Sequence, residues 1–352
     1  MTILLTGTRA PATLDLARRL WREGVRVIGA DSLRYPLGKF SQAFASHYRV
    51  PSPRLDRRAY LNAILDIVEK EGVTLLWPTC EEIFHLATIH GEFPDGCRLL
   101  FDPIAVLDPL HDKLRFARFA GHHAPESWDG PDAPDRRTTV WKPRYSRFAT
   151  RVRFGLKPFN PNGWMGQSYV RGDEFSSWSL CVEGEIRTMT FYDCPARVSH
   201  GSGCAFEPMW EENAAAMIAE FASSLNFTGS LAFDFIRGYD GKLYVLECNP
   251  RLTSGIHVLD PAVRISDLLA RPGELPPPMV PAQIRIATMF SKPSVAWSSP
   301  DVIAATDDPG PARGQFAGIA EYLGIAIRHF HSLTSATTRD IEYNGEAGED
   351  GA

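Results

Sequence analysis

Two carboxylates in one predicted β-hairpin have the residue types and the spacing of a metal site. Residues 230–251 form two apolar runs joined by Asp240-Gly241, which is typical of a two-residue hairpin turn. With Tyr239 and Lys242 paired across this turn, Asp234 lies directly opposite Glu247. Two carboxylates about 5 Å apart repel by roughly 3 kcal/mol at an effective dielectric of 20. The neighbouring side chains are apolar, so water would not relieve this repulsion cheaply.

A hard divalent cation would relieve the repulsion. Asn249 lies on the same strand face as Glu247, because side chains alternate along a strand. Asp, Glu and Asn supply only oxygen ligands, which suits Mg²⁺ completed by phosphate oxygens. Two other interpretations stay open. The acids could share a proton or pair with Arg251, and a register slip of one residue would place Asp234 and Glu247 on opposite faces.

The composition is typical of an ordinary globular protein with two or three domains. The chain has 352 residues, of which 44% are hydrophobic and 22% are charged. A net charge of −5 without basic runs argues against a nucleic-acid surface, and no apolar run is long enough to span a membrane. Six scattered cysteines without a CxxC pair, and an N-terminus unlike a signal peptide, predict a cytoplasmic protein with reduced thiols.

The first part of the chain alternates predicted strands and helices, which indicates a Rossmann-like domain with a parallel sheet over residues 1–105. Arg9 and Ala12 occupy the second and third glycine positions of the dinucleotide fingerprint, so we expect no nicotinamide site. The predicted strands are 2–6, 25–30, 73–77 and 98–101, and the predicted helices are 11–23, 58–71 and 81–90.

Polar side chains at the carboxyl ends of these strands are candidates for a substrate pocket, because ligands of parallel sheets bind there. Arg9, Glu81 and Glu82 are the main candidates, with Asp31 and Thr79 beside them. For each residue alone, a helix cap or a solvated charge is the commoner role.

The next part, residues 106–270, is predicted to be α+β, because hairpins and strands outnumber helices. One hairpin is expected to turn at Glu183-Gly184, and helices are expected near 111–120 and 211–225. A Pro-rich linker then begins a C-terminal extension, residues 271–343, with strands expected near 283–289 and 325–330 and a helix near 315–323. The acidic tail 344–352 is predicted to be disordered.

Four segments in this order resemble the ATP-grasp superfamily, which includes carbamoyl phosphate synthetase, biotin carboxylase and D-alanine–D-alanine ligase. The likeness covers roughly residues 1–260 and implies a two-part ATP-grasp domain after the N-terminal domain. The segments are His111-Asp-Lys113, Val140-Trp-Lys142-Pro, Gln167-Ser-Tyr-Val-Arg-Gly-Asp-Glu174 and Gly229–Arg251.

The resemblance implies a role for each matching residue. Lys113 and Lys142 would contact ATP phosphates, and Arg251 would stabilise the phosphoryl group in transfer, with Lys142 and Arg251 as the catalytic residues. The remaining roles are adenine recognition by Gln167, Tyr169 and Val170, ribose binding by Glu174, and binding of Mg²⁺ or Mn²⁺ by Asp234, Glu247 and Asn249.

The segment after Lys142 departs from the family pattern. Family members commonly have glycines there, so that backbone amides wrap the phosphates. Residues 144–150 contain no glycine, so side chains such as Arg144 and Arg147 could replace the amides, or the loop could close differently. A second segment, residues 200–203, contains glycines and is expected to be a flexible connection or a phosphate contact.

The resemblance implies an ADP-forming ligase that joins a small-molecule carboxylate to an amine through an acyl phosphate, such as an amino-acid or peptide ligase. A small-molecule kinase and a nucleotide-binding module without ligase activity are the alternatives. The partners would be small molecules, and a homodimer is compatible with the family. Further candidates for substrate contacts are Arg197, Ser254 and His257, although a surface ion pair and a core-edge histidine are the plainer interpretations.

Overall fold

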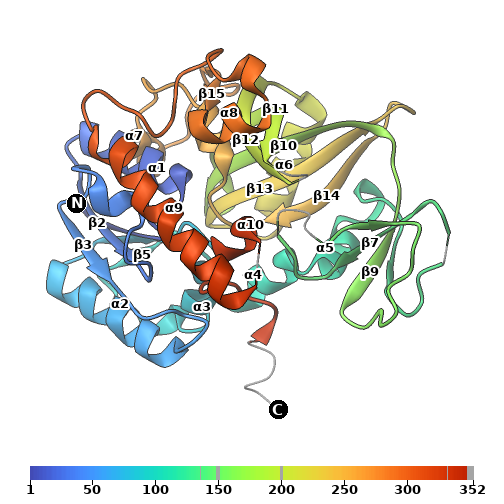
Figure 1. The fold of residues 1–352 in the computed structure, drawn as a ribbon, viewed down its shortest axis with the longest axis horizontal. Helices are drawn as coiled ribbons and strands as arrows, with labels where there is room; N and C mark the ends of the chain where they lie inside the picture. Colours follow the sequence, from blue (N-terminus) through green and yellow to red (C-terminus); the bar gives the residue numbers. More distant parts are fainter. Residues whose placement is uncertain (135, 148–150, 199–200, 331, 347–352) are drawn as a thin grey trace.

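The computed structural model describes residues 1–134, 136–147, 151–198, 201–330 and 332–346. Three sheets organise this part of the chain: a parallel sheet, a small antiparallel sheet and a large antiparallel sheet. In Figure 1 the parallel sheet and the small antiparallel sheet lie at opposite sides of the molecule, with the large sheet between and above them. This order agrees with the predicted fold class.

The N-terminal domain is the predicted Rossmann-like unit, with strand order β3-β2-β1-β4-β5. Its central strand β1 contains the fully buried Ile3, Leu4 and Leu5, because both faces of a parallel sheet are covered. Among its strands, only the short, polar β3 was not predicted. The elements are β1 Thr2–Thr6, α1 Pro11–Arg22, β2 Arg26–Asp31, η1 Leu37–Phe40, β3 Ser46–Arg49, α2 Arg57–Glu71, β4 Leu75–Trp77, α3 Glu82–Ala87, η2 His90–Glu92 and β5 Arg98–Leu99.

Two helices connect this domain to the small antiparallel sheet, where a single helix was predicted. Asp112 separates α4 from α5: its backbone is extended, and its side chain caps α5 by accepting from the amides of Leu114 and Arg115. The small sheet has the order β6-β9-β7-β8. The elements are α4 Ile104–His111, α5 Lys113–Ala120, η3 Gly121–His123, β6 Ser127–Asp129, β7 Thr139–Pro143, β8 Arg153–Phe154 and β9 Trp164–Ser168.

The large sheet has the order β14-β13-β10-β11-β12-β15 and is antiparallel throughout. Glu183 and Gly184 both have positive φ angles, 51° and 78°, so they form the two-residue turn predicted for this hairpin. Strand β12 begins at Ser202, where a flexible connection was expected; residues 199 and 200 lie outside the described residues. The elements are β10 Gly172–Val182, β11 Glu185–Val198, β12 Ser202–Met209, α6 Glu212–Ser224, β13 Gly229–Gly238, β14 Leu243–Asn249, η4 Ser254–Val258 and α7 Ile265–Ala270.

The C-terminal extension is mainly helical, so the two strands predicted within it are wrong. The strand expected near 325–330 lies instead at the end of the long helix α9, whose Gly314 packs closely against the Phe40 ring of η1. Residues 344–346 of the predicted disordered tail are described, and the rest of the tail lies outside the described residues. The elements are β15 Ala282–Gln283, α8 Arg285–Ser291, η5 Pro293–Val295, α9 Gly310–His329 and α10 Leu333–Ala336.

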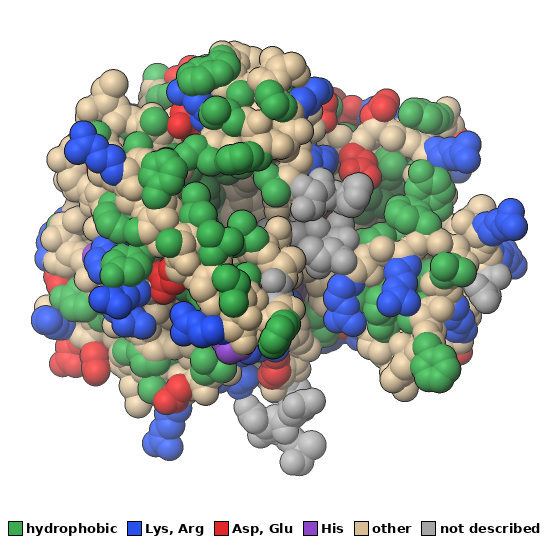
Figure 2. All heavy atoms as spheres, viewed as in Figure 1, with side chains coloured by type: hydrophobic (Ala, Val, Ile, Leu, Met, Phe, Trp, Pro, Cys, Tyr) green, Lys and Arg blue, Asp and Glu red, His purple; other side chains and the backbone are tan. Residues whose placement is uncertain are grey.

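The extension packs back onto the N-terminal domain. Arg18 of α1 forms a buried ion pair with Asp308, and Tyr343 belongs to the main apolar core together with Phe84. Helix α9 crosses the front of the molecule, and Figure 2 shows hydrophobic side chains on this face; the exposed ones on α9 are Phe316, Leu323 and Ile327. Within the described residues, none of the helices combines the length and the apolar character needed to cross a membrane.

Candidate active site

The hairpin of β13 and β14 brings Asp234 opposite Glu247, as predicted, but through a different turn. The loop has three residues, 239–241, because the Gly238 amide donates to the Lys242 carbonyl. The extra loop residue shifts the register by one, and a β-bulge between Asp234 and Phe235 shifts it back. The predicted two-residue turn was therefore wrong, while the predicted pairing of the acids was correct.

The bulge supplies a contact that the sequence did not reveal. Phe235 pairs with Val245 and Asp234 pairs with Glu247, so Leu246 is the extra residue of β14. Its carbonyl accepts a hydrogen bond from Lys142 Nζ at 3.3 Å. Lys142 lies near the end of β7 in the small sheet, and its burial lowers the pKa of the ammonium group to about 8, although Glu247 opposes this shift.

A second lysine approaches the pair from the other side. Lys113 is the first residue of α5, and its Nζ lies 3.3 Å from Glu247 Oε2. The same nitrogen donates to the Ser146 carbonyl at 2.9 Å. Lys113 and Lys142 therefore both act on the carboxylate of Glu247, and their contacts with phosphates stay a prediction.

The two acids have opposite electrostatic environments. Burial raises the pKa of Asp234, and the charge of Glu247 raises it further, while a 2.6 Å hydrogen bond from Ser176 Oγ opposes the rise. Burial also acts to raise the pKa of Glu247, but Lys113 and Lys142 lower it overall. Without a cation the pair favours one shared proton. With a divalent cation both acids can be ionised, and their oxygen-only donors fit Mg²⁺.

Asn249 and Arg251 continue from this pair at the end of β14. Asn249 pairs with Ala232, and its Oδ1 lies 3.4 Å from Arg251 Nη2. The Nε of Arg251 is buried and has no hydrogen-bond partner among the described residues. A buried donor without a partner is costly, so Arg251 has capacity for an anion.

The residues predicted to hold adenine and ribose follow one another from β9 into β10. Gln167 is buried, and its amide donates to Ser127 Oγ at 3.0 Å. The backbone amide of Tyr169 donates a hydrogen bond to the Thr138 carbonyl. Val170 follows Tyr169 and precedes β10. Glu174 of β10 is exposed and lies 3.7 Å from Arg197 of β11.

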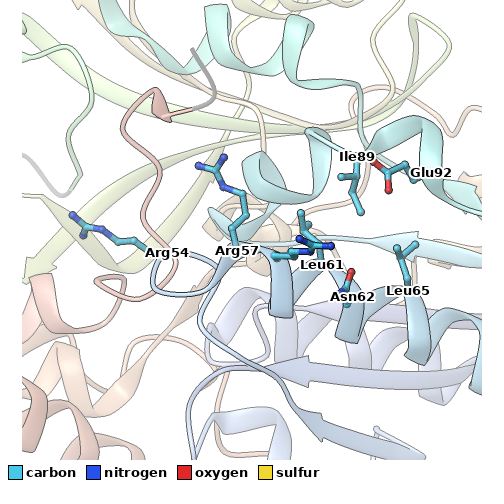
Figure 3. Close-up of a pocket in the computed structure, with 8 residues that line it drawn as sticks. Arg54, Arg57, Leu61, Asn62, Leu65, Ile89 and Glu92 are labelled. Carbon is cyan, nitrogen blue, oxygen red and sulfur yellow. The ribbon is translucent and has the colours of Figure 1, made fainter. Parts of the chain in front are cut away.

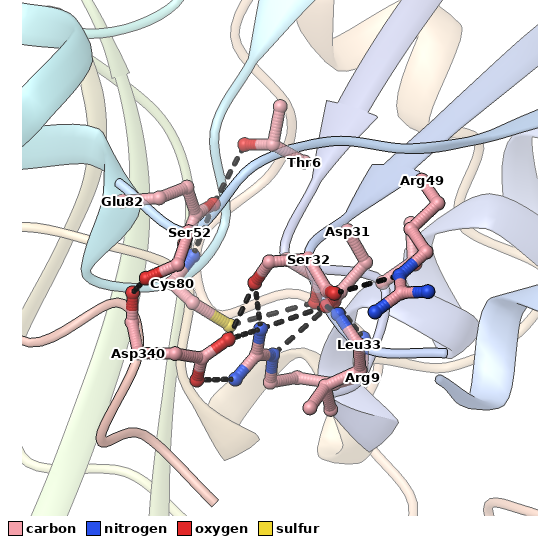
Figure 4. A network of polar contacts seen from close by, with 12 residues as sticks. Thr6, Arg9, Asp31, Ser32, Leu33, Arg49, Ser52, Cys80, Glu82 and Asp340 are labelled. Carbon is pink, nitrogen blue, oxygen red and sulfur yellow. Dashed lines mark hydrogen bonds and ion pairs between the residues drawn. The ribbon is translucent and has the colours of Figure 1, made fainter. Parts of the chain in front are cut away.

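Arg9 is surrounded by polar groups at the carboxyl ends of β1 and β2 (Figure 4). Its guanidinium binds Asp31 at 2.7 Å and Asp340 at 2.5 Å, and it also donates to Ser32. The nearby Glu82 accepts from Thr6 Oγ1 at 2.6 Å. Arg9 and Glu82 thus both have hydrogen-bond partners within the protein, and their roles as substrate contacts stay predictions.

Glu81 is also engaged, through an ion pair with Arg147. Burial acts to raise the pKa of Glu81, but the charge of Arg147 lowers it to about 2. Arg147 follows β7 in the segment where the glycines are absent. The structure therefore joins two residues that the sequence analysis had placed in different roles.

The other candidate substrate residues lie at separate places. Ser254 begins η4, and the ring of His257 in η4 binds Asp15 of α1 at 2.8 Å through Nδ1, which ties η4 to the N-terminal domain. Arg197 lies inside β11 and pairs with Glu174. Sequence analysis missed Ser176, although its position two residues after Glu174 places both on one strand face.

A groove between α2 and η2 contains none of the predicted site residues (Figure 3). Its lining includes Arg54, Arg57, Arg58, Leu61 and Glu92. The predicted metal ligands and the two lysines lie elsewhere, between the small sheet and the large sheet.

No family model and no curated protein matches this chain. Solved structures do. N5-carboxyaminoimidazole ribonucleotide synthetase from Thermus thermophilus matches with a TM-score of 0.59 and 18% identity, over 80% of this chain and 81% of that chain. The chain has the ATP-grasp fold. An L-amino acid ligase from Bacillus licheniformis matches with a TM-score of 0.55 and 13% identity, over 72% and 68% of the two chains.

Another ATP-grasp relative in structure is the biotin carboxylase domain of a Hydrogenobacter thermophilus 2-oxoglutarate carboxylase, at 16% identity and a TM-score of 0.57. The match covers 73% of this chain but only 65% of that chain, less than two thirds of its length. That structure contains MgADP, ADP and bicarbonate. At these identities the likeness shows the ATP-grasp fold alone.

Proposed function

We propose that this protein is an ATP-dependent, ADP-forming ligase that joins a small-molecule carboxylate to an amine. The observation that carries the proposal is the pair of Asp234 and Glu247, held opposite each other with Lys113 and Lys142 beside Glu247. Phosphoryl transfer depends on positioning and on neutralising phosphate charge, and this arrangement supplies both.

Each residue has a role in binding or positioning. Asp234, Glu247 and Asn249 would hold Mg²⁺, which neutralises phosphate charge when bound. Lys113 and Lys142 would contact the phosphates, and Arg251 has a buried donor available for the transferred group. Adenine would lie against residues 167–170, with Glu174 at the ribose.

The reaction follows from the weakness of a carboxylate as an electrophile. Transfer of the γ-phosphate of ATP to a carboxylate oxygen gives an acyl phosphate and ADP. The amine then attacks the acyl carbon and expels phosphate, forming an amide. Exclusion of water protects the acyl phosphate, and the L-amino acid ligase among the structural matches supports amino acids as the first substrates to test.

The test measures ADP and phosphate release with pools of amino acids and other small carboxylates and amines. We expect ADP release that depends on an acid–amine pair, and a loss of at least about 10²-fold in Glu247→Gln, because charge-stabilising groups contribute this much or more. Glu207→Gln, an exposed carboxylate on β12 of the same sheet, is the matched control and should behave as wild type.

The products separate the proposal from its rivals. An amide with ADP supports a ligase. A phosphorylated metabolite would indicate a kinase, and binding of MgATP without turnover would indicate a nucleotide-binding module. Full activity in Glu247→Gln would overturn the assignment of the metal site.

A further inference from the structure

The end of the described chain lies across the N-terminal domain, and we call residues 337–346 the C-terminal strap. Its first part is bound by Arg9, which donates to the Thr337 carbonyl at 3.0 Å and to Asp340 (Figure 4). Ser52 Oγ donates to the Asp340 carbonyl at 2.6 Å. These contacts fix the strap over the carboxyl ends of β1 and β2.

The second part of the strap is anchored by an aromatic ring. Tyr343 is 1% exposed, and its ring stacks on Phe84 of α3 at 5.2 Å between ring centres. The same ring lies against His111 at the end of α4 and edge-to-face with Tyr145, which follows β7. One side chain thereby joins the strap, the N-terminal domain and the segment after β7.

Arg147 lies where these segments meet. Its Nε donates to Glu81 of the N-terminal domain, its Nη1 donates to Asn344 Oδ1 at 3.0 Å, and its Nη2 donates to the Tyr343 carbonyl. The Tyr343 amide in turn faces Glu81 Oε2 at 3.4 Å. A planar fork with several donors suits this role, because it can hold three acceptors in fixed directions.

The residues before Arg147 are held in a similar way, and we call residues 143–147 the phosphate loop. Arg144 forms an ion pair with Asp112, and Tyr145 donates to Asp108 at 2.8 Å. The carbonyl of Ser146, between these contacts and Arg147, accepts from Lys113. Lys113 of α5 therefore contacts both the backbone of the phosphate loop and Glu247, while the side chains of Arg144 and Tyr145 bind protein partners.

We propose that the C-terminal strap is a working part of the nucleotide site, in which Tyr343 and Asn344, acting through Arg147 and Glu81, hold the phosphate loop in place. These four are positioning residues. A glycine-rich loop can arrange its amides around phosphate, and this loop, without glycines, is fixed by side chains instead. A loop that is ordered beforehand does not have to be ordered by the nucleotide, which favours binding.

The inference rests on the proposed nucleotide site and is tested by MgATP affinity, measured by titration calorimetry. We expect Tyr343→Ala to weaken MgATP binding by about tenfold or more, which corresponds to about 1.4 kcal/mol. Asn344 is exposed, and we expect Asn344→Ala to weaken the binding by a smaller factor. A chain that ends at Glu346 keeps every strap contact described and is the matched control.

Limited digestion with trypsin gives a readout that does not depend on nucleotide. Arg147, Arg151 and Arg153 provide cleavage sites in and after the phosphate loop, and Tyr343→Ala and Asn344→Ala should be cut there faster than wild type and the control. Wild-type MgATP affinity and wild-type cleavage in Asn344→Ala and Tyr343→Ala would overturn the inference. If wild type itself does not bind MgATP, the proposed function fails, while the cleavage rates still decide whether the strap holds the loop.

Discussion

At the scale of single residues, the neighbours Glu81 and Glu82 show that burial alone does not set the pKa of an acid. Both are almost fully buried at the start of α3. Burial raises the pKa of Glu82, although Thr6 and the backbone donate to it. Glu81 faces Arg147, and its pKa is lowered to about 2. A charged partner therefore reverses the effect of burial.

The two glutamates should contribute to stability with opposite dependence on pH. The folded-state pKa of Glu81 is below its unfolded value of 4.5, so its contribution, about 3 kcal/mol from the shift, is present above pH 4.5 and is lost as the pH falls toward 2. Glu81→Gln should accordingly be less stable than wild type at pH 7, with the difference shrinking in acid. Denaturant unfolding at a series of pH values measures this.

Glu82→Gln provides the comparison of opposite sign. The folded-state pKa of Glu82 is raised, so its contribution to stability is present below pH 4.5 and decreases as the pH rises. The free energy of unfolding of Glu82→Gln, relative to that of wild type, should therefore increase as the pH rises from acid to neutral. Parallel pH profiles for the two variants would contradict both assignments.

The facing acids lead to a second prediction at this scale. Asp234→Asn removes one of two adjacent carboxylates, so without metal the variant should be more stable than wild type by about 1–3 kcal/mol. Added MgCl₂ should raise the Tm of wild type and leave that of Asp234→Asn unchanged. A magnesium response of equal size in both proteins would show that the ion binds elsewhere.

At the scale of elements, the hairpin of β13 and β14 reaches the predicted pairing through two compensating irregularities. A three-residue turn moves the register by one, and the bulge at Leu246 restores it. The bulge also turns the Leu246 carbonyl toward Lys142. Bulges often redirect groups at functional sites, and this one links the strand that carries Glu247 to Lys142 of the small sheet.

Deletion of Leu246 should separate these two effects. The shortened strand resumes regular alternation with Glu247 still opposite Asp234, so we expect the fold to survive. Lys142 loses its carbonyl partner, and we expect MgATP affinity to fall by roughly tenfold. Deletion of the exposed Tyr239 shortens the turn instead, keeps the pair of Gly238 and Lys242, and should bind MgATP as wild type. Equal affinity in both deletion variants would contradict a role for the bulge.

At the scale of the whole molecule, the C-terminal extension is joined to the N-terminal domain by buried polar contacts. Arg18 and Asp308 form an ion pair at 2.8 Å, and both side chains are at most 3% exposed. Arg18 also donates to the Val302 and Ile303 carbonyls, and Asp308 accepts from Ser41. The extension and the N-terminal domain are thus expected to unfold together.

The neighbouring exposed pair of Arg22 and Asp307 is a matched comparison, with side chains 41% and 43% exposed. Arg18→Met leaves Asp308 buried without its partner and should lower the free energy of unfolding by about 3–5 kcal/mol. Arg22→Met should lower it by about 0–1 kcal/mol. Denaturant unfolding followed by circular dichroism and by tryptophan fluorescence tests both values. Similar effects of the two substitutions, or separate transitions in wild type, would contradict the coupling.

Local patterns in the sequence predicted much of the fold and the pairing of Asp234 with Glu247. The alternation of strands and helices indicated the parallel sheet, and the turn residues Glu183-Gly184 and Asp240-Gly241 indicated the two hairpins. The strands predicted near 283–289 and 325–330 failed, because short apolar runs fit a strand or a helix equally well and packing decides between them.

The sequence by itself determined which oxygen ligands and lysines are available and which of them share a strand, because turns and strand alternation act over a few residues. Only the tertiary structure decided what Arg147 does. Its partners Glu81 and Tyr343 are 66 and 196 residues away along the chain, and no local periodicity relates positions so far apart. Contacts of this kind form only when separate elements pack together, so the joining of the C-terminal strap to the phosphate loop is a property of the folded chain.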